Sequence, residues 1–397
     1  MQRSIILVGL TVFAMGQTIL FALLGPVARE IGLAEWQVGA IISASAIVFV
    51  LISPLWGTLA DRWGRKNTIV SGLASYALTT LLFAWLLNQG MSGAIAGMAA
   101  FSALVGARLL YAVGSAGIQP AAVAMMADLT SRSDRSAGVA LVGAAFGIGT
   151  VIGPGVAYAF VGFGLLVPLL VAAGAAMLLA VLAGIFVADP KRPADEDGST
   201  ASAKPDIRLL APLLALAFGS FVAISALQQT MAFYIQDFTG SDAEETTRLA
   251  GNAFVILALA MLIIQGGVVQ KLKPRPAIMM VVGFPLALAG IAVMAWAPTY
   301  WLIIVGFGIM GAGFGLVQPG INALVSLTVS AEAQGNAAGF VQAAMAGGFV
   351  IGPISGTLIY ALSPKAPMLL AITCCAICFI VFLWTQKTRP DMGDAAA

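Results

Sequence analysis

Charged residues are scarce in this sequence. Only 9% of its 397 residues are Asp, Glu, Lys or Arg, whereas 60% are hydrophobic. A water-soluble globular protein carries about 25% charged residues, so this chain has too little charge to cover a soluble surface. The composition excludes a water-soluble globule and predicts an all-α membrane protein, because the bilayer core leaves a bare backbone without hydrogen-bond partners.

Histidine is absent and cysteine is rare. With no histidine and no pair of acids within an apolar run, the sequence lacks the nucleophile, base and metal-ligand constellations that a membrane enzyme would need. We therefore predict that the protein is not an enzyme and holds no metal or other cofactor. Cys374, Cys375 and Cys378 share one apolar run, which excludes an extracellular disulfide framework and indicates packing roles.

Long apolar runs make up most of the chain. Crossing about 30 Å of hydrocarbon takes about 20 helical residues, and twelve runs of this length can be placed. The first follows a single basic residue, but it is as long as a full span and has no convincing cleavage site, so we read it as a span rather than a signal peptide. The predicted spans are 4–24, 36–58, 67–87, 98–126, 137–161, 164–187, 209–236, 249–269, 277–296, 300–327, 337–361 and 366–385.

Lysine and arginine are concentrated in every second segment between the predicted spans. With the N-terminus taken as cytoplasmic, 15 of the 19 basic residues fall in cytoplasmic segments, and only Arg29, Arg248 and Lys365 fall outside. Cytoplasmic loops of membrane proteins carry such an excess. We therefore predict a multi-pass protein of the inner (cytoplasmic) membrane with both termini in the cytoplasm. The basic loops are orientation signals and do not indicate nucleic-acid binding.

The chain divides into two related halves. A polar stretch at 188–208 separates a six-helix bundle at 1–187 from a second at 209–397, which ends in a short cytoplasmic tail. Gln119-Pro120 matches Gln318-Pro319, and Gly153-Pro154 matches Gly352-Pro353, both at an offset of 199 residues. Gln17-Thr18 and Gln229-Thr230 form a weaker third pair at another offset. We predict two pseudo-symmetric bundles around a central site, an arrangement that transporters use.

The loop after the second span carries a distinctive motif. It reads Gly57-Thr-Leu-Ala-Asp61-Arg62-Trp-Gly64-Arg65-Lys66 and resembles the signature loop of the major facilitator superfamily at every defining position. Arg108 resembles that family's second motif, although Ala112 stands where glycine is common. The stretch Gly149–Gly155 resembles the helix 5 motif of its twelve-helix drug/proton antiporters, but Ala157 and Tyr158 replace the closing glycine pair.

The resemblance implies a mechanism for the signature loop. Gly57 and Gly64 would permit close approach and a tight turn, while Asp61 would act as a latch toward the start of helix 11 near Gly335. Arg65 would bridge to Asp128 at the inner end of helix 4. The second half has only a degenerate version of this loop, which lacks the acidic residue. Gating would therefore depend mainly on the loop of the first half.

Two glycine–proline pairs are candidate bends in the gating machinery. Gly153-Pro154 and Gly352-Pro353 lie inside the predicted spans 137–161 and 337–361. Proline removes a backbone hydrogen bond and small neighbours allow close helix packing. Bends at a bundle interface would suit a rocking mechanism, and an ordinary helix kink is the alternative.

Arg108 is the only charge well inside a span, and such a residue is a functional candidate by default. A polar stripe continues from it at helical spacing. The resemblance places helices 1, 4, 7 and 10 around the central cavity, and amides, Phe and Met there would suit an amphipathic solute. Interhelical hydrogen bonding and packing are the alternative roles. The predicted substrate-binding residues are Gln17, Arg108, Tyr111, Ser115, Gln119, Gln228, Gln229, Met310, Phe314 and Gln318.

The sequence favours a transporter that works by alternating access. The main hypothesis is proton-coupled efflux of drugs or amphipathic metabolites by a monomer surrounded by membrane lipids. The alternative is an exporter or facilitator of an organic anion, such as a siderophore or carboxylate, bound through Arg108. Proton coupling is the open point, because all 17 acids lie in loops or at helix ends. Asp128 and Asp237 are the acids nearest to the membrane.

Overall fold

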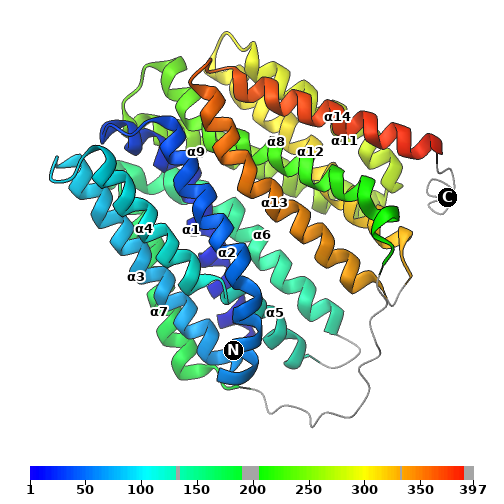
Figure 1. The fold of residues 1–397 in the computed structure, drawn as a ribbon, viewed down its shortest axis with the longest axis horizontal. Coiled ribbons are helices and arrows are strands. Elements are labelled where there is room, and N and C mark those ends of the chain that lie inside the picture. Colours follow the sequence, from blue (N-terminus) through cyan, green and yellow to red (C-terminus); the bar gives the residue numbers. More distant parts are fainter. Residues whose placement is uncertain (131–134, 190–204, 331–332, 389–397) are drawn as a thin grey trace. The chain divides into compact units, whose positions relative to one another are not determined.

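The described part of the protein consists of helices joined by short connections. A computed structural model describes residues 1–130, 135–189, 205–330 and 333–388, and within these residues no strand occurs (Figure 1). Twelve helical spans in these ranges are long and apolar enough to cross a membrane. Large apolar side chains such as Leu51, Ile185 and Trp301 are about two-thirds exposed along them, an arrangement that suits lipid and not water. The predicted fold class is confirmed.

Two compact units make up the chain. The first comprises Met1–Glu196 with Gly240–Asn252, and the second comprises Asp197–Thr239 with Ala253–Ala397. The domain bounds predicted above stay a prediction, since 190–204 of the expected linker and 389–397 of the expected tail lie outside the described residues.

The first unit contains α1 to α7 and the start of α9, up to Asn252. Helix α1 packs against α6 and α7, α3 packs against α4 and α7, and α2 packs against α4. Their apolar faces meet in one core that includes Phe13, Tyr76, Tyr111 and Met125. The helices are α1 (Gln2–Glu30), α2 (Glu35–Trp63), α3 (Arg65–Met91), α4 (Gly97–Ser115), α5 (Ile118–Asp128), α6 (Arg135–Phe160) and α7 (Val167–Phe186).

The second unit repeats this packing. Helix α8 packs against α13 and α14, as α1 does against α6 and α7, and α11 packs against α12, as α3 does against α4. Helix α9 (Ala243–Ile263) is divided between the units and belongs to the second from Ala253 on. The other helices of the second unit are α8 (Ile207–Thr239), the π-helix η2 (Ile264–Val269), α10 (Gln270–Leu272), α11 (Pro276–Ala295), α12 (Tyr300–Thr328), α13 (Gln334–Tyr360) and α14 (Ala366–Thr388).

Glycines let the two repeated helix pairs come very close. A Cβ atom at Gly153 of α6 would lie 2.0 Å from Thr18 Oγ1 and 2.3 Å from the Met15 carbonyl oxygen of α1. In the second unit, a Cβ atom at Gly352 of α13 would lie 1.9 Å from Ser225 Oγ of α8. Both α6 and α13 continue as helix through the proline that follows. The glycine–proline motif therefore marks a seam between two helices of one unit.

This packing also sets the register of the first helix in each half. Because Gly153 faces Thr18 and Gly352 faces Ser225, Thr18 is equivalent to Ser225. The third sequence pair, Gln17-Thr18 with Gln229-Thr230, is therefore wrong. The two amide–threonine dipeptides lie at different heights on their helices.

Two predicted spans are less regular than expected. The span 98–126 is interrupted at Ala116 and Gly117, between α4 and α5. Pro120 lies just after this break and has no N–H to donate back to Ala116. The span 249–269 ends in η2, which contains the glycine pair Gly266-Gly267. Such π segments occur mostly as single turns within α-helices.

Candidate functional site

The turn of the signature loop depends on a single residue between two helices. Gly64 has φ +101° and joins the end of α2 to the start of α3. Residues other than glycine rarely adopt a φ angle of this size. There is also no space for a side chain, since a Cβ atom at Gly64 would lie 2.5 Å from Asp189 Oδ2. The tight turn predicted at this glycine is confirmed.

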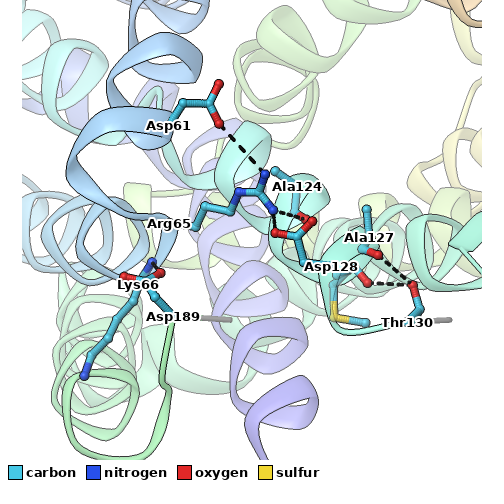
Figure 2. Close-up of polar contacts among 9 residues, drawn as sticks. Asp61, Arg65, Lys66, Ala124, Ala127, Asp128, Thr130 and Asp189 are labelled. Atoms are coloured by element: carbon cyan, nitrogen blue, oxygen red, sulfur yellow. Dashed lines mark hydrogen bonds and ion pairs between the residues drawn. The ribbon is translucent and has the colours of Figure 1, made fainter. Parts of the chain in front are cut away.

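A carboxylate from a distant segment caps the start of α3. Asp189, which follows α7 in the chain, accepts a hydrogen bond of 2.8 Å from the backbone N–H of Lys66 (Figure 2). The first N–H groups of a helix have no partner within the helix, and its N-terminus carries partial positive charge. Asp189 therefore fixes the end of the first bundle to the signature loop.

Arg65 lies at the centre of an ion network on this loop (Figure 2). Its Nη1 atom pairs with Asp128 Oδ2 at the end of α5 and also donates a 3.0 Å hydrogen bond to the Ala124 carbonyl oxygen. Its Nη2 atom lies 3.9 Å from Asp61 Oδ1, four residues earlier in the chain on α2. The expected pairing of Arg65 with Asp128 is present. The planar fork of arginine suits this combination of acceptors.

The loop residues differ in how accessible they are. The Asp61 side chain is 58% exposed, whereas that of Asp128 is 14% exposed. Arg62 is exposed on the surface next to Trp63. The close approach expected at Gly57 is not found, because a Cβ atom there would meet no atom within 4 Å.

Sequence reasoning missed the role of Asp189. Its position directly before a proline at the end of a span was the available signal, because Asp-Pro often initiates a turn. Nothing in the sequence indicated which helix the carboxylate would reach, 123 positions earlier in the chain.

A second polar cluster surrounds Arg108 inside the first unit. Arg108 is only 8% exposed. Its Nη2 atom donates long hydrogen bonds to Gln17 Oε1 at 3.5 Å and to Ser45 Oγ at 3.4 Å. Its guanidinium carbon lies 4.1 Å from the centre of the Tyr111 ring, within cation–π range. Gln17 in turn donates to the Tyr111 hydroxyl. The structure thus brings together three of the predicted residues: Gln17, Arg108 and Tyr111.

Aromatic rings form the wall behind this cluster. Phe13, Phe49, Tyr76 and Tyr111 lie with ring centres 5.5 to 6.4 Å apart. Within the described structure, Arg108 Nε and the Tyr76 hydroxyl are buried and have no hydrogen-bond partner. Phe49 and Tyr76 did not stand out in the sequence, because aromatic residues in a span usually serve packing.

The predicted polar stripe does not continue smoothly beyond this cluster. Ser115 is fully buried at the end of α4, and its hydroxyl has no partner among the described residues. Gln119 lies beyond the helix break, on α5, and is exposed.

The predicted binding residues of the second unit have more apolar surroundings than those of the first. Met310 and Phe314 are fully buried in α12, and Gln229 is buried in α8 with no described partner for its amide atoms. Gln228 and Gln318 remain partly exposed. The position matched to Arg108 by the repeat is Phe307, which packs edge-on against Phe254 with ring centres 5.5 Å apart. A buried cation in one half thus corresponds to an aromatic pair in the other.

One acid of the second unit has a defined partner. The Tyr360 hydroxyl, at the end of α13, donates a 2.6 Å hydrogen bond to Asp237 Oδ2 near the end of α8. Tyr360 is buried, and its ring lies 5.8 Å from that of Phe233. The α8–α13 seam therefore ends in a charged hydrogen bond.

Comparison with known families decides the class of protein. The sequence profile of the Major Facilitator Superfamily matches residues 6–294 and 249–396, which together span nearly the whole chain. The chain belongs to the Major Facilitator Superfamily. As a member of this superfamily with twelve spans, it is a multi-pass transporter of the inner membrane and not an enzyme. Alternating access is the mechanism that fits the family.

Individual relatives of this superfamily member are distant but full-length. Multidrug resistance protein 2 of Bacillus subtilis (strain 168) is 24% identical over 371 residues, which cover 90% of this chain and 88% of the relative. Quinolone resistance protein NorA of Staphylococcus aureus (strain COL) is 21% identical over 380 residues, which cover 92% of each.

Solved structures give the same fold. A bacterial homolog to the human lysosomal transporter Spinster superposes with a TM-score of 0.76 at 15% identity, covering 98% of this chain and 97% of that one. The nucleoside transporter NupG superposes with a TM-score of 0.74 at 14% identity, covering 96% of this chain and 99% of that one.

Proposed function

We propose that this chain is a proton-coupled exporter of small amphipathic organic solutes, active as a monomer with both termini in the cytoplasm. The observation that carries the proposal is the likeness, over about nine-tenths of both chains, to relatives named for multidrug and quinolone resistance. Export of amphipathic compounds would confer such resistance. The excess of lysine and arginine in alternate loops supports the orientation.

Partly exposed amides are the candidate contacts for the solute. Gln17 and Gln228 lie on the first helix of each unit, and Gln318 lies on α12. Gln228 and Gln318 are partly exposed, so their amides can donate or accept a hydrogen bond. The Gln17 amide already contacts Tyr111 and Arg108 and would exchange one of these contacts for the solute. Met310 and Phe314 would supply the adaptable apolar wall on the side of the second unit.

The signature loop would act as a gate. Asp61 is mostly exposed, although it lies 3.9 Å from Arg65, so its carboxylate can reach a further partner. In the outward-facing state that partner would be the N-terminus of α13, whose partial positive charge favours an anion. The variant Asp61→Asn keeps the shape and loses the charge. We expect it to insert normally but to transport more slowly in proteoliposomes, and an unchanged rate would contradict the gate.

Asp128 is the proposed proton carrier. Among the described residues it is the acid that is both largely buried and paired with a cation, Arg65. Protonation of its carboxylate would weaken that ion pair and loosen the loop. The gain or loss of one proton would thereby be linked to the position of the gate.

Transport and proton movement can be followed together in one experiment. Proteoliposomes that contain an internal pH indicator are given a cationic amphipathic dye. An antiporter moves protons against the dye, so the internal pH changes in step with dye flux, and a protonophore abolishes dye accumulation. Dye flux without a pH change would refute proton coupling, and a lack of flux for every cationic and neutral amphipathic compound would refute the substrate class.

An organic anion is the second candidate substrate. The observation that favours it is the buried cation Arg108, whose described hydrogen-bond partners are all neutral. Thermal stabilisation of the purified protein by siderophores or carboxylates, but not by cationic drugs, would favour this function. Intact transport by Arg108→Lys would argue against bidentate recognition of a carboxylate, because lysine lacks the planar fork.

A further inference from the structure

Arg108 is a buried cation without an acidic partner. No Asp or Glu of the described chain forms an ion pair with it. Its contacts are two long hydrogen bonds to neutral side chains and the face of Tyr111. A buried charge that is not paired is costly. These neutral contacts compensate the charge only in part, and Nε remains without an acceptor.

A small cavity is lined in part by Arg108. Arg108, Tyr76 and Thr80 line its polar part, and Phe83 and Leu169 line its apolar part. All its lining residues belong to the first unit. The cavity volume is about 10 Å³. This is room for about one water-sized ligand and excludes any organic solute.

The polar groups at the cavity are mainly hydrogen-bond donors, so they suit a ligand that accepts hydrogen bonds. Arginine Nε–H can only donate. The buried Tyr76 hydroxyl has no partner and can also donate. Thr79 donates its own hydroxyl hydrogen to the Ser75 carbonyl oxygen at 2.7 Å. The site thus combines a positive charge with unused donors, and no carboxylate of the described residues lines it.

We propose that this cavity binds one monatomic inorganic anion, of which chloride is the common example. The anion would accept hydrogen bonds from Arg108 Nε and the Tyr76 hydroxyl and would neutralise the buried cation. A water molecule would fill the same space but would leave the charge uncompensated. The small volume distinguishes this ligand from any transported solute.

Gly16 keeps the Tyr76 hydroxyl in place. A Cβ atom at Gly16 would lie 1.5 Å from Tyr76 Oη, so the hydroxyl rests directly on the α1 backbone. Any larger residue would push the hydroxyl away. The sequence of α1 therefore positions one of the two donors of the proposed site.

Bromide provides a direct test, because it replaces chloride and scatters X-rays anomalously. Crystals of the full-length protein are grown in bromide, and the anomalous map is inspected at the cavity. The expected result is one peak within hydrogen-bonding distance of Arg108 Nε and Tyr76 Oη. An ordered water molecule there, with no bromide peak, overturns the proposal.

Thermal stability in solution provides a second test. The purified protein is titrated with chloride at constant ionic strength, with gluconate as the replacing anion. We expect the melting temperature to rise with chloride in a saturable way. Tyr76→Phe removes one hydrogen bond to a charged ligand and should weaken the apparent affinity roughly tenfold to hundredfold. The matched control Tyr158→Phe alters an exposed tyrosine and should leave the affinity unchanged.

The variant Arg108→Gln separates a specific site from a general salt effect. It removes the charge, so the saturable response to chloride should disappear even if the baseline melting temperature changes. A response that persists in Arg108→Gln, or equal stability of the native protein in chloride and gluconate, refutes the proposal.

Discussion

The seam between α1 and α6 makes a quantitative prediction about Gly153→Ala. The added methyl carbon would lie 2.0 Å from Thr18 Oγ1 and 2.3 Å from the Met15 carbonyl oxygen. Carbon and oxygen atoms in van der Waals contact are normally more than 3 Å apart. A hydroxyl can rotate away, but the carbonyl belongs to the backbone of α1. The two helices must therefore separate by several tenths of an ångström or more.

The size of the effect follows from two opposing terms. Overpacking of a tight interface costs about 1–3 kcal/mol, whereas replacing glycine by alanine inside a helix gains about 0.5–1 kcal/mol. The net of these ranges is a loss of up to about 2.5 kcal/mol, and we expect Gly153→Ala to lower the free energy of unfolding by about 1 kcal/mol, near the middle of that range. For a unit of 150–250 residues, this corresponds to a fall in melting temperature of about 2–4 °C per kcal/mol.

Two further variants make the prediction a graded series. At Gly352 the nearest backbone atom is the Val222 carbonyl oxygen at 2.8 Å, so Gly352→Ala should destabilise less than Gly153→Ala. Gly147 lies on α6 as well, but a Cβ atom there would meet no atom within 4 Å. Gly147→Ala is therefore the matched control and should be neutral or slightly stabilising.

The assay is thermal unfolding of the purified protein in one detergent, followed by the loss of the monodisperse peak in size-exclusion chromatography. The expected order of melting temperatures is Gly147→Ala, then Gly352→Ala, then Gly153→Ala, from highest to lowest. Equal melting temperatures for Gly153→Ala and Gly147→Ala would refute the reasoning, because the seam would then have room for a methyl group.

Three other substitutions test single contacts. Asp189→Ala removes the cap of α3 and should cost about 0.5–2 kcal/mol of stability, measured as a lower melting temperature, while Asp189→Asn should retain part of the cap. Arg65→Lys cannot pair with Asp128 and also keep the fork geometry, so transport should slow while expression in the membrane is retained; an unchanged rate would show that one point charge suffices. Tyr360→Phe removes the hydrogen bond to Asp237; because that carboxylate is exposed and water can replace the lost bond, stability should fall by only about 0.5–1.5 kcal/mol, and an unchanged melting temperature would contradict the prediction.

The architecture could be predicted from the sequence because a membrane limits the choices. Apolar runs of span length must be helices, and two repeats at a common offset indicate two related bundles. The apolar runs are local in the chain and the two matched pairs are repeated within it. The expected Arg65–Asp128 pair came from the resemblance of the signature loop to the family, because the two residues are far apart in the sequence.

The missing features depend on contacts between distant segments. Asp189 caps α3, and Tyr360 donates a hydrogen bond to Asp237. In both contacts the partners are 123 residues apart, and no sequence pattern indicates which partner each residue reaches. The same holds for the third repeat pair, where sequence similarity suggested Gln229-Thr230 but helix packing selects Ser225. The break before Pro120 could have been anticipated from the proline, whereas the π segment at Ile264–Val269 has no comparable signal.

The cavity beside Arg108 has a consequence for the transport cycle. Alternating access moves the two halves against each other while each half largely keeps its internal shape. Since every residue that lines this cavity belongs to the first unit, its walls need not change when the protein switches between its inward-open and outward-open forms. An ion held there would accompany the protein through every turnover without being carried across. It would serve as a permanent part of the structure, as a bound metal does in many soluble proteins.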